Sequence, residues 1–139
     1  MRFEQAALDL LYELTDGYPY FVQAYGKVTW DAAVGSPIRV ADVTEAAPEA
    51  EAELAVGFFG ARFDRATPAE RDYMTAMADL AAADEPVATA EIAARLGRKP
   101  QSLSPARDGL IKKGLVYAAE RGSVAFTVPH FGRFLRGRA

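Results

Sequence analysis

The stretch from Lys99 to Val128 constrains the fold of this chain more than any other part of the sequence. Residue types that favour a helix start come first, at Ser102, Ser104 and Pro105. They suit that place because the first N–H groups of a helix have no partner within it. Apolar residues then recur at helical spacing, at Leu103, Ala106 and Leu110. Two lysines and Gly114 follow, a pattern typical of a helix C-terminus.

After Gly114 the pattern changes from helical spacing to alternation. Leu115 to Tyr117 predict a strand, and Arg121 to Ser123 predict a turn. Val124, Phe126 and Val128 alternate as a returning strand. A helix, a glycine stop, a strand, a basic turn and a second strand are the order of a winged helix-turn-helix, with a small β-wing at its end.

The residues before this stretch predict the remaining elements of the same domain. Thr67 to Glu70 form a capping box with proline at the first helical position. The helix that follows is expected to run to about residue 82 and to bury Tyr73, Met77 and Leu80. Pro86 to Ala88 are expected to form an edge strand, and Thr89 is expected to cap the next helix.

The first part of the chain predicts four helices. They are expected at Glu4 to Leu14, Pro19 to about Val34, from Val40 to Pro48, and from Glu49 to about Phe63. Pro48 is expected to end or kink the third helix, because proline lacks the N–H that a helix interior uses. Phe63 to Ala66 are the predicted junction. The sequence therefore predicts a mainly α protein with two domains, 1–63 and 67–139.

Charge is divided unevenly along the chain. Residues 1–66 carry a net charge of −6, whereas the part from Arg95 onward holds 10 basic and 2 acidic residues, a net +8. A basic C-terminal part favours a polyanionic partner such as DNA. A solvated, soluble helical surface explains the same charges without a partner.

Composition argues against several function classes. The chain has no cysteine and a single histidine, His130, so we expect no metal centre, no cofactor and no catalytic triad. We therefore predict that the chain is not an enzyme. His130 is interpreted as a residue that helps to cap the last helix. No apolar run approaches the roughly 18 residues of a membrane span, so we predict a cytoplasmic protein.

The second domain resembles winged-helix domains of the multiple-antibiotic-resistance regulator type. Three segments carry this resemblance: Thr89–Gly97, Ser102–Ser104 and Leu110–Val116. The resemblance implies a fold more than a function.

The first domain resembles the helical lid of AAA+ ATPases of the origin-recognition-like and STAND type. The segment Leu14–Gln23 carries the resemblance, and Gly17-Tyr18-Pro19 within it matches the motif that closes over bound nucleotide in that group. A winged helix follows the lid in those proteins. The resemblance therefore implies the DNA-binding C-terminal region of such an ATPase.

The chain departs from that family where nucleotide hydrolysis is concerned. It has no G-x-x-x-x-G-K-[ST] phosphate loop and no strand that ends in magnesium-binding acids. Nucleotide contact at Gly17 and Pro19 therefore requires an ATPase core from another chain or from a longer parent. A helix C-cap followed by a first-turn proline explains both residues without a ligand.

The predicted DNA surface centres on the helix after Lys99, which a winged helix places in the major groove. Candidate contacts are Arg98, Lys99, Gln101, Ser102, Ser104, Arg107, Lys112 and Arg121. Gly109 is expected on the outward face, where it lets a backbone approach closely, and Asp108 is expected to point outward and repel phosphate. We expect weak, mostly phosphate-directed binding of duplex DNA with a log–log salt slope of roughly −3 to −4.5.

The rival hypothesis is a protein-interaction or regulatory module. Its surface is the aromatic set on the second helix: Tyr18, Tyr20, Tyr25 and Trp30. Packing on an ATPase core or formation of a homodimer would use this surface.

Overall fold

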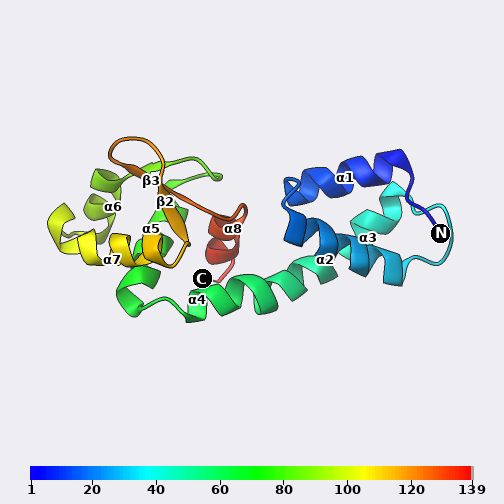
Figure 1. The fold of residues 1–139 in the computed structure, drawn as a ribbon, viewed down its shortest axis with the longest axis horizontal. Coiled ribbons are helices and arrows are strands. Elements are labelled where there is room, and N and C mark those ends of the chain that lie inside the picture. The colour runs from blue at the N-terminus through cyan, green and yellow to red at the C-terminus, as the bar shows by residue number, and fades with distance from the viewer. Residues whose placement is uncertain (139) are drawn as a thin grey trace. The chain divides into compact units, whose positions relative to one another are not determined.

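A computed structural model describes residues 1–138 and is mainly helical, with one small antiparallel sheet (Figure 1). The predicted mainly α class is confirmed. The chain forms two compact units, Met1–Gly60 and a second that begins at Ala61. The first contains α1 (Gln5–Thr15), α2 (Pro19–Ala32), α3 (Val40–Leu54) and the π-helical segment η1 (Ala55–Gly60). The second contains α4 (Ala61–Asp64), α5 (Pro68–Leu80), β1 (Val87–Ala88), α6 (Thr89–Leu96), α7 (Pro100–Lys112), β2 (Val116–Ala118), β3 (Ser123–Phe126) and α8 (Phe131–Arg136).

The first unit packs three helices around a small core. Helix α3 contacts both α1 and α2, and the side chains of Phe21, Val43 and Leu54 are buried between them. Helix α1 ends at Thr15, whose hydroxyl donates to the Leu11 carbonyl at 2.8 Å. The next residue, Asp16, adopts the left-handed conformation. The chain therefore turns between α1 and α2 in three residues.

Helix α3 runs through Pro48, so the prediction that this proline separates two helices is wrong. Proline in a helix interior costs about 3 kcal/mol. Buried side chains lie on both sides of Pro48, at Val43, Ala46, Ala50 and Leu54. Burying a single valine or leucine side chain contributes about 1.5–3 kcal/mol, so the continuous apolar face outweighs the lost backbone hydrogen bond.

The wide π-helical turn of η1 was not predicted. A Cβ added at Gly60 would lie 2.8 Å from the Ala55 carbonyl oxygen, closer than real side chains allow, so the turn requires a glycine there. Phe58 and Phe59 are both buried in this turn. Their rings lie 5.1 and 5.4 Å from that of Phe21. Successive buried aromatics explain why no simple helical period marks this segment.

Helix α5 is at the centre of the second unit. The capping box predicted at its N-terminus is confirmed. The Thr67 hydroxyl accepts from the Glu70 N–H at 3.2 Å, and the Glu70 carboxylate accepts from the Thr67 N–H at 3.0 Å. Helix α8 packs along α5, as do α6 and α7. Tyr73, Met77 and Phe131 are almost fully buried where these helices meet.

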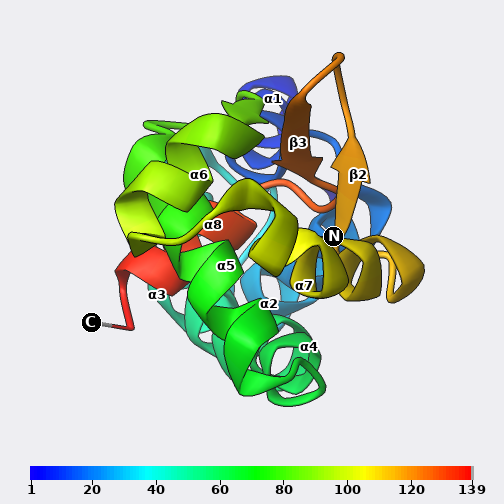
Figure 2. The ribbon, with the colours of Figure 1, turned by 90° about the vertical axis from the view of Figure 1, so that its left-hand side faces the viewer.

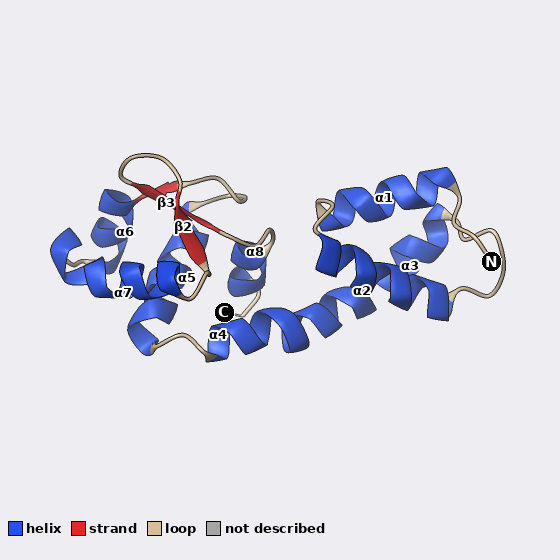
Figure 3. Cartoon of the chain, viewed as in Figure 1, coloured by secondary structure: helices blue, strands red, loops and turns tan. Residues whose placement is uncertain are grey.

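The sheet has the order β1-β3-β2, with both pairs antiparallel. Figure 3 draws the strands in red among the blue helices. Val87 pairs with Val124 and Val116 with Phe126. The predicted edge strand is therefore confirmed as β1. Between β2 and β3 the chain turns at Gly122, whose φ of 78° is one that glycine adopts at no steric cost.

Three local predictions in the second unit are wrong. Helix α7 begins at Pro100, so Pro105 lies inside the helix rather than in its first turn. Ala88, not Thr89, is the N-cap of α6, and the Thr89 hydroxyl donates instead to the Gly122 carbonyl. Leu80 is 38% exposed at the end of α5. At Thr89 a partner distant in sequence, Gly122, decides the local structure.

Gly109 does not face outward as predicted. A Cβ built at this position overlaps the carboxylate of Glu70, a side chain that is 5% exposed on the neighbouring helix α5. The glycine therefore lets α7 approach α5, and the close approach belongs to the core of the unit.

We expect Gly109→Ala to lower the free energy of unfolding of the second unit by about 1–3 kcal/mol, because the methyl group must displace a held carboxylate. Urea unfolding followed by far-UV circular dichroism measures this change. Gly26→Ala in α2 is the matched control. A Cβ there meets no atom within 4 Å, so helix propensity should stabilise that variant by up to about 1 kcal/mol. Equal losses in both variants would contradict the packing described.

Candidate nucleic-acid interface

The N-terminal end of α7 carries most of the predicted contact residues. Pro100 is the first helical residue, and Lys99 is the N-cap. The Ser102 hydroxyl donates to the Lys99 carbonyl at 2.7 Å, so this side chain stabilises the turn that enters the helix. Ser104 lies one residue beyond the first turn and is exposed. The helix start thus presents a short polar surface to solvent.

Seven of the eight predicted contact residues are exposed, and Arg107 is partly buried. The exposed residues are Arg98, Lys99, Gln101, Ser102, Ser104, Lys112 and Arg121. They come from the turn between α6 and α7, from α7 itself and from the turn between β2 and β3. In Figure 2 the molecule is turned so that α6, α7 and this hairpin face the viewer.

Ion pairs divide the basic residues of this region into two groups. Three are paired: Arg95 with Asp79 at 3.1 Å, Arg107 with Asp108 at 3.4 Å, and Lys113 with Glu70 at 2.5 Å. The other four basic residues between positions 95 and 121 form no ion pair with any residue of 1–138: Arg98, Lys99, Lys112 and Arg121. The second group is available for an external anion.

The turn that carries Arg121 is held in place by α6. The Thr89 N–H and the Thr89 hydroxyl both donate to the Gly122 carbonyl, at 2.9 and 3.2 Å. The turn is further closed by Ser123, whose N–H donates to the Glu120 carbonyl at 2.9 Å. A hairpin tip that is tied to a helix start positions Arg121 more firmly than a free loop would.

Asp108 lies on the outward side of α7, as predicted. Its side chain is 71% exposed, and its carboxylate contacts the Arg107 guanidinium. Asp108 thus places one negative charge among the free cations of the surface. An anionic partner that approaches α7 therefore meets repulsion from Asp108.

A cleft of about 330 Å³ lies beside the N-terminal half of α7. Its lining residues are Tyr73, Thr89, Pro100, Gln101, Leu103, Ser104, Arg107 and Gly122. Three of the predicted contact residues thus share one concave surface. Tyr73 and Thr89 also belong to this surface, although their sequence pattern predicts only a core position and a helix cap.

Glu70 and Lys113 hold α7 against α5, a pair that the sequence did not predict. The Lys113 ammonium also donates to the Arg65 carbonyl at 3.1 Å. Burial alone would raise the pKa of Glu70, but hydrogen bonds from Lys113 and Thr67 and the charge of Lys113 bring the pKa below its ordinary value of 4.5. The capping box signalled the role of Glu70, whereas a pairing across 43 residues leaves no local signal.

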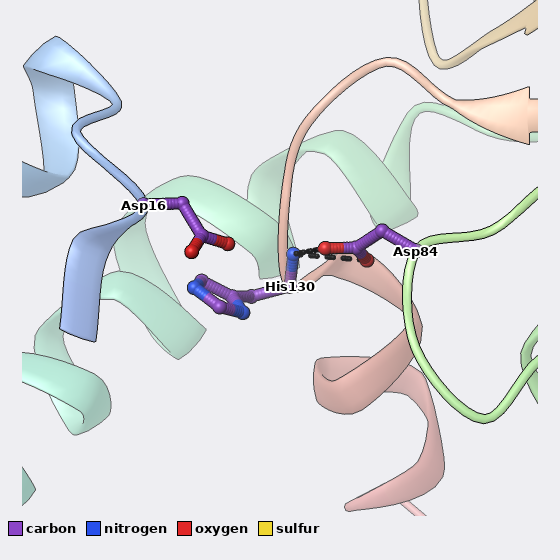
Figure 4. Close-up of side chains that lie close together, drawn as sticks. All are labelled: Asp16, Asp84 and His130. Carbon is purple, nitrogen blue, oxygen red and sulfur yellow. Dashed lines mark hydrogen bonds between the residues drawn. The ribbon is translucent and has the colours of Figure 1, made fainter. Parts of the chain in front are cut away.

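His130 is the N-cap of α8, but its side chain does not cap that helix. Its backbone N–H instead donates to both carboxylate oxygens of Asp84, at 3.3 Å each (Figure 4). The residue has a left-handed φ of 69°. The predicted position of His130 at the cap of the last helix is therefore confirmed, and its backbone rather than its side chain makes the contact to Asp84.

Gly17 and Pro19 lie at the junction of α1 and α2. Gly17 has a positive φ of 67°, and its N–H donates to the Tyr12 carbonyl at 3.1 Å. The ring of Tyr12 lies over the Cα of Gly17, so that a Cβ would overlap it. Pro19 is the first residue of α2. Chain geometry thus accounts for both residues, and nucleotide contact stays a prediction.

The aromatic set of the first unit is only partly on the surface. Tyr20 is 56% and Trp30 42% exposed, and Tyr18 is half-buried. Tyr25 is 5% exposed and belongs to the core, which corrects its place in the predicted interaction surface. Tyr20 also packs on Phe58, with the ring centroids 4.8 Å apart. The exposed part of this set is therefore Tyr20 and Trp30.

Among the helices of residues 1–138, none combines the length and the apolar character that crossing a bilayer requires.

Comparison with protein families gives one match. Residues 56–135 match a family described as a domain of unknown function (DUF8462). This range contains all eight predicted DNA-contact residues and the cleft, and it excludes Gly17 and Pro19. Neither the curated proteins nor the solved structures gave a match.

We expect Glu70→Gln to lower the stability of the second unit by about 1–3 kcal/mol at neutral pH, because a charged hydrogen bond to Lys113 is lost. The folded-state pKa of Glu70 lies below the unfolded value. Its contribution is therefore complete above pH 4.5 and is lost as the pH falls through the folded-state pKa.

Chemical unfolding measured from neutral to acidic pH tests this sign. The parent should lose stability on acidification more steeply than Glu70→Gln. Glu120→Gln, which changes an exposed carboxylate in the same unit, should follow the parent. Identical pH dependence in the parent and Glu70→Gln would exclude the stabilising ion pair.

Proposed function

The chain belongs to the DUF8462 family, and we propose that its second unit is a winged-helix domain that binds duplex DNA weakly and mainly through phosphates. The order of elements supports this proposal. A helix, an edge strand, two helices and a two-stranded hairpin follow one another from α5 to β3, with the sheet order β1-β3-β2. In this interpretation α7 is the recognition helix and the β2–β3 hairpin is the wing.

The observation that carries the proposal is the group of four cations without an ion pair. Arg98 and Lys99 enter α7, Lys112 ends it, and Arg121 lies at the hairpin turn. A recognition helix that lies in the major groove has the phosphates of both strands on its flanks. Cations at both ends of α7 and on the wing suit such phosphates, while Gln101 and Ser104 suit base edges or phosphates.

Fluorescence anisotropy of a labelled random duplex, measured at several salt concentrations, tests the proposal directly. Each neutralised phosphate contributes about −0.9 to the slope of log K against log salt. Three to five contacts therefore give a slope of roughly −3 to −4.5. Absence of binding at low salt would exclude DNA as a partner of this unit.

We expect the double variant Lys99→Glu, Lys112→Glu to lose measurable duplex binding at moderate salt. Both side chains are exposed and form no ion pair within residues 1–138, so the fold should be unaffected. Replacing two attractive charges by two repulsive ones removes about two phosphate contacts. Anisotropy titration gives the affinity, and circular dichroism checks the fold.

The matched control is Arg2→Glu, Lys27→Glu, which changes the net charge equally at exposed sites of the first unit. It should bind as the parent does. Equal loss in both double variants would mean that net charge, and not the α7 surface, determines binding.

We expect Asp108→Asn to bind duplex DNA about 2- to 10-fold more tightly than the parent. The variant removes the outward negative charge and releases Arg107 from its ion pair, and exposed charge pairs are worth about 0.2–1 kcal/mol each. Anisotropy at low salt measures the gain. Unchanged or weaker binding would contradict the placement of α7 at the phosphate backbone.

For the first unit we propose a lid-like role in an AAA+-type ATPase, with the second unit as its DNA-binding C-terminal region. The support is local. A left-handed Gly17 and a first-turn Pro19 join α1 to α2 in the order of the Gly-x-Pro motif. Binding of ATP in this proposal requires a core supplied by a longer parent or by another chain.

A protein-interaction module is the second candidate, favoured by the exposed Tyr20 and Trp30. Analytical ultracentrifugation distinguishes the two functions. A homodimer that Tyr20→Ala and Trp30→Ala disrupt, in a protein that binds no duplex, would favour the interaction module.

A further inference from the structure

We propose that the cleft beside α7 holds one phosphodiester of the DNA backbone together with its deoxyribose, and that the Tyr73 hydroxyl donates a hydrogen bond to this phosphate. The inference deepens the proposed function and rests on it. It adds a neutral contact, from the core helix α5, to the charged contacts already assigned.

The first observation is the state of Tyr73. The side chain is 1% exposed and lines the cleft. Its hydroxyl makes no hydrogen bond to any other residue of 1–138. The oxygen is not fully enclosed, so it reaches the open space of the cleft and lacks a partner among the described residues there. A hydroxyl at the wall of an open cleft can gain that partner from a bound molecule.

The second observation is the protonation state of the same group. Burial raises the pKa of Tyr73, Arg107 opposes this shift, and Asp108 reinforces it. The hydroxyl therefore keeps its proton at neutral pH. A protonated phenol can donate to an anionic oxygen, which a phenolate would repel.

The third observation is the chemistry of the remaining lining. Arg107 uses one guanidinium nitrogen for Asp108, and a guanidinium has five N–H donors, so further donors remain for an anion. Ser104 adds an exposed hydroxyl. Pro100 and Leu103 give the cleft an apolar side that suits the carbon face of a sugar. The lining thus fits a singly charged group joined to an apolar ring.

The fourth observation is the position of the cleft. Five of its eight lining residues belong to α7, and Gly122 belongs to the hairpin turn beside Arg121. The cleft is therefore continuous with the surface that carries the free cations. Its volume of 330 Å³ is at the lower end of small-ligand pockets, which leaves room for one phosphate and its sugar. Continuity with that surface favours a phosphate of a duplex over a separate small molecule.

Tyr73→Phe and Arg107→Gln test the inference by different signatures in the anisotropy titration. Tyr73→Phe should bind about tenfold more weakly with an unchanged salt slope, because the lost contact is neutral. Arg107→Gln should bind more weakly and reduce the magnitude of the slope by about 0.9. Tyr117→Phe, which removes an exposed hydroxyl from β2 of the same unit, is the matched control and should bind as the parent does.

Thermal unfolding shows whether Tyr73→Phe keeps the packing of α5. If Tyr73→Phe binds as tightly as the parent while Lys99→Glu, Lys112→Glu loses binding, the inference is wrong and the proposed function stands. If the parent itself binds no duplex at low salt, both are wrong.

Inorganic phosphate, added at constant ionic strength, should leave duplex binding unchanged. Displacement of the duplex from the parent but not from Tyr73→Phe would assign the cleft to a free phosphate and overturn the inference.

Discussion

The ion pair between Glu70 and Lys113 is the contact on which the arrangement of the second unit depends. Glu70 completes the capping box of α5 and also accepts from Lys113 at the C-terminal end of α7. Gly109 leaves the space that the carboxylate occupies. One buried carboxylate thus joins a helix start to the end of a helix 43 residues away. Breaking a buried pair leaves an uncompensated charge, which is strongly destabilising.

The same contact determines which basic residues near the end of α7 are paired and which are not. Because the Lys113 ammonium is paired with Glu70 of α5, it is not available to an external anion, while the adjacent Lys112 is exposed and forms no ion pair within residues 1–138. Arg95 and Arg107 are likewise paired within the unit. The basic residues of this region therefore fall into two groups. One group forms ion pairs within the unit, and the other is available to an external anion. Only the available group supports the proposed phosphate contacts, and its four cations agree with a modest salt dependence.

The two units differ in what holds them together. In the first, aromatic packing dominates: Phe21, Phe58 and Phe59 form one buried cluster, which the π-helical turn of η1 brings together. In the second, polar contacts between distant residues add to a buried core that includes Tyr73, Met77 and Phe131. Arg136 donates to the carbonyls of Ala78 and Ala81 at 2.9 and 3.0 Å, and so joins α8 to the end of α5. These contacts connect residues more than fifty positions apart.

The sequence alone determined the features that depend on neighbouring residues. The Thr67–Glu70 capping box, the glycine stop at Gly114, the edge strand at Val87 and the exposed α7 cations are all local patterns, and the structure agrees with them. Only the tertiary structure decided the passage of α3 through Pro48, the inward position of Gly109 and the partner of Lys113. It also brought Tyr73 and Thr89 to the same cleft as Ser104. In each case the deciding energy comes from burial or pairing with distant residues, which no periodicity along the chain records.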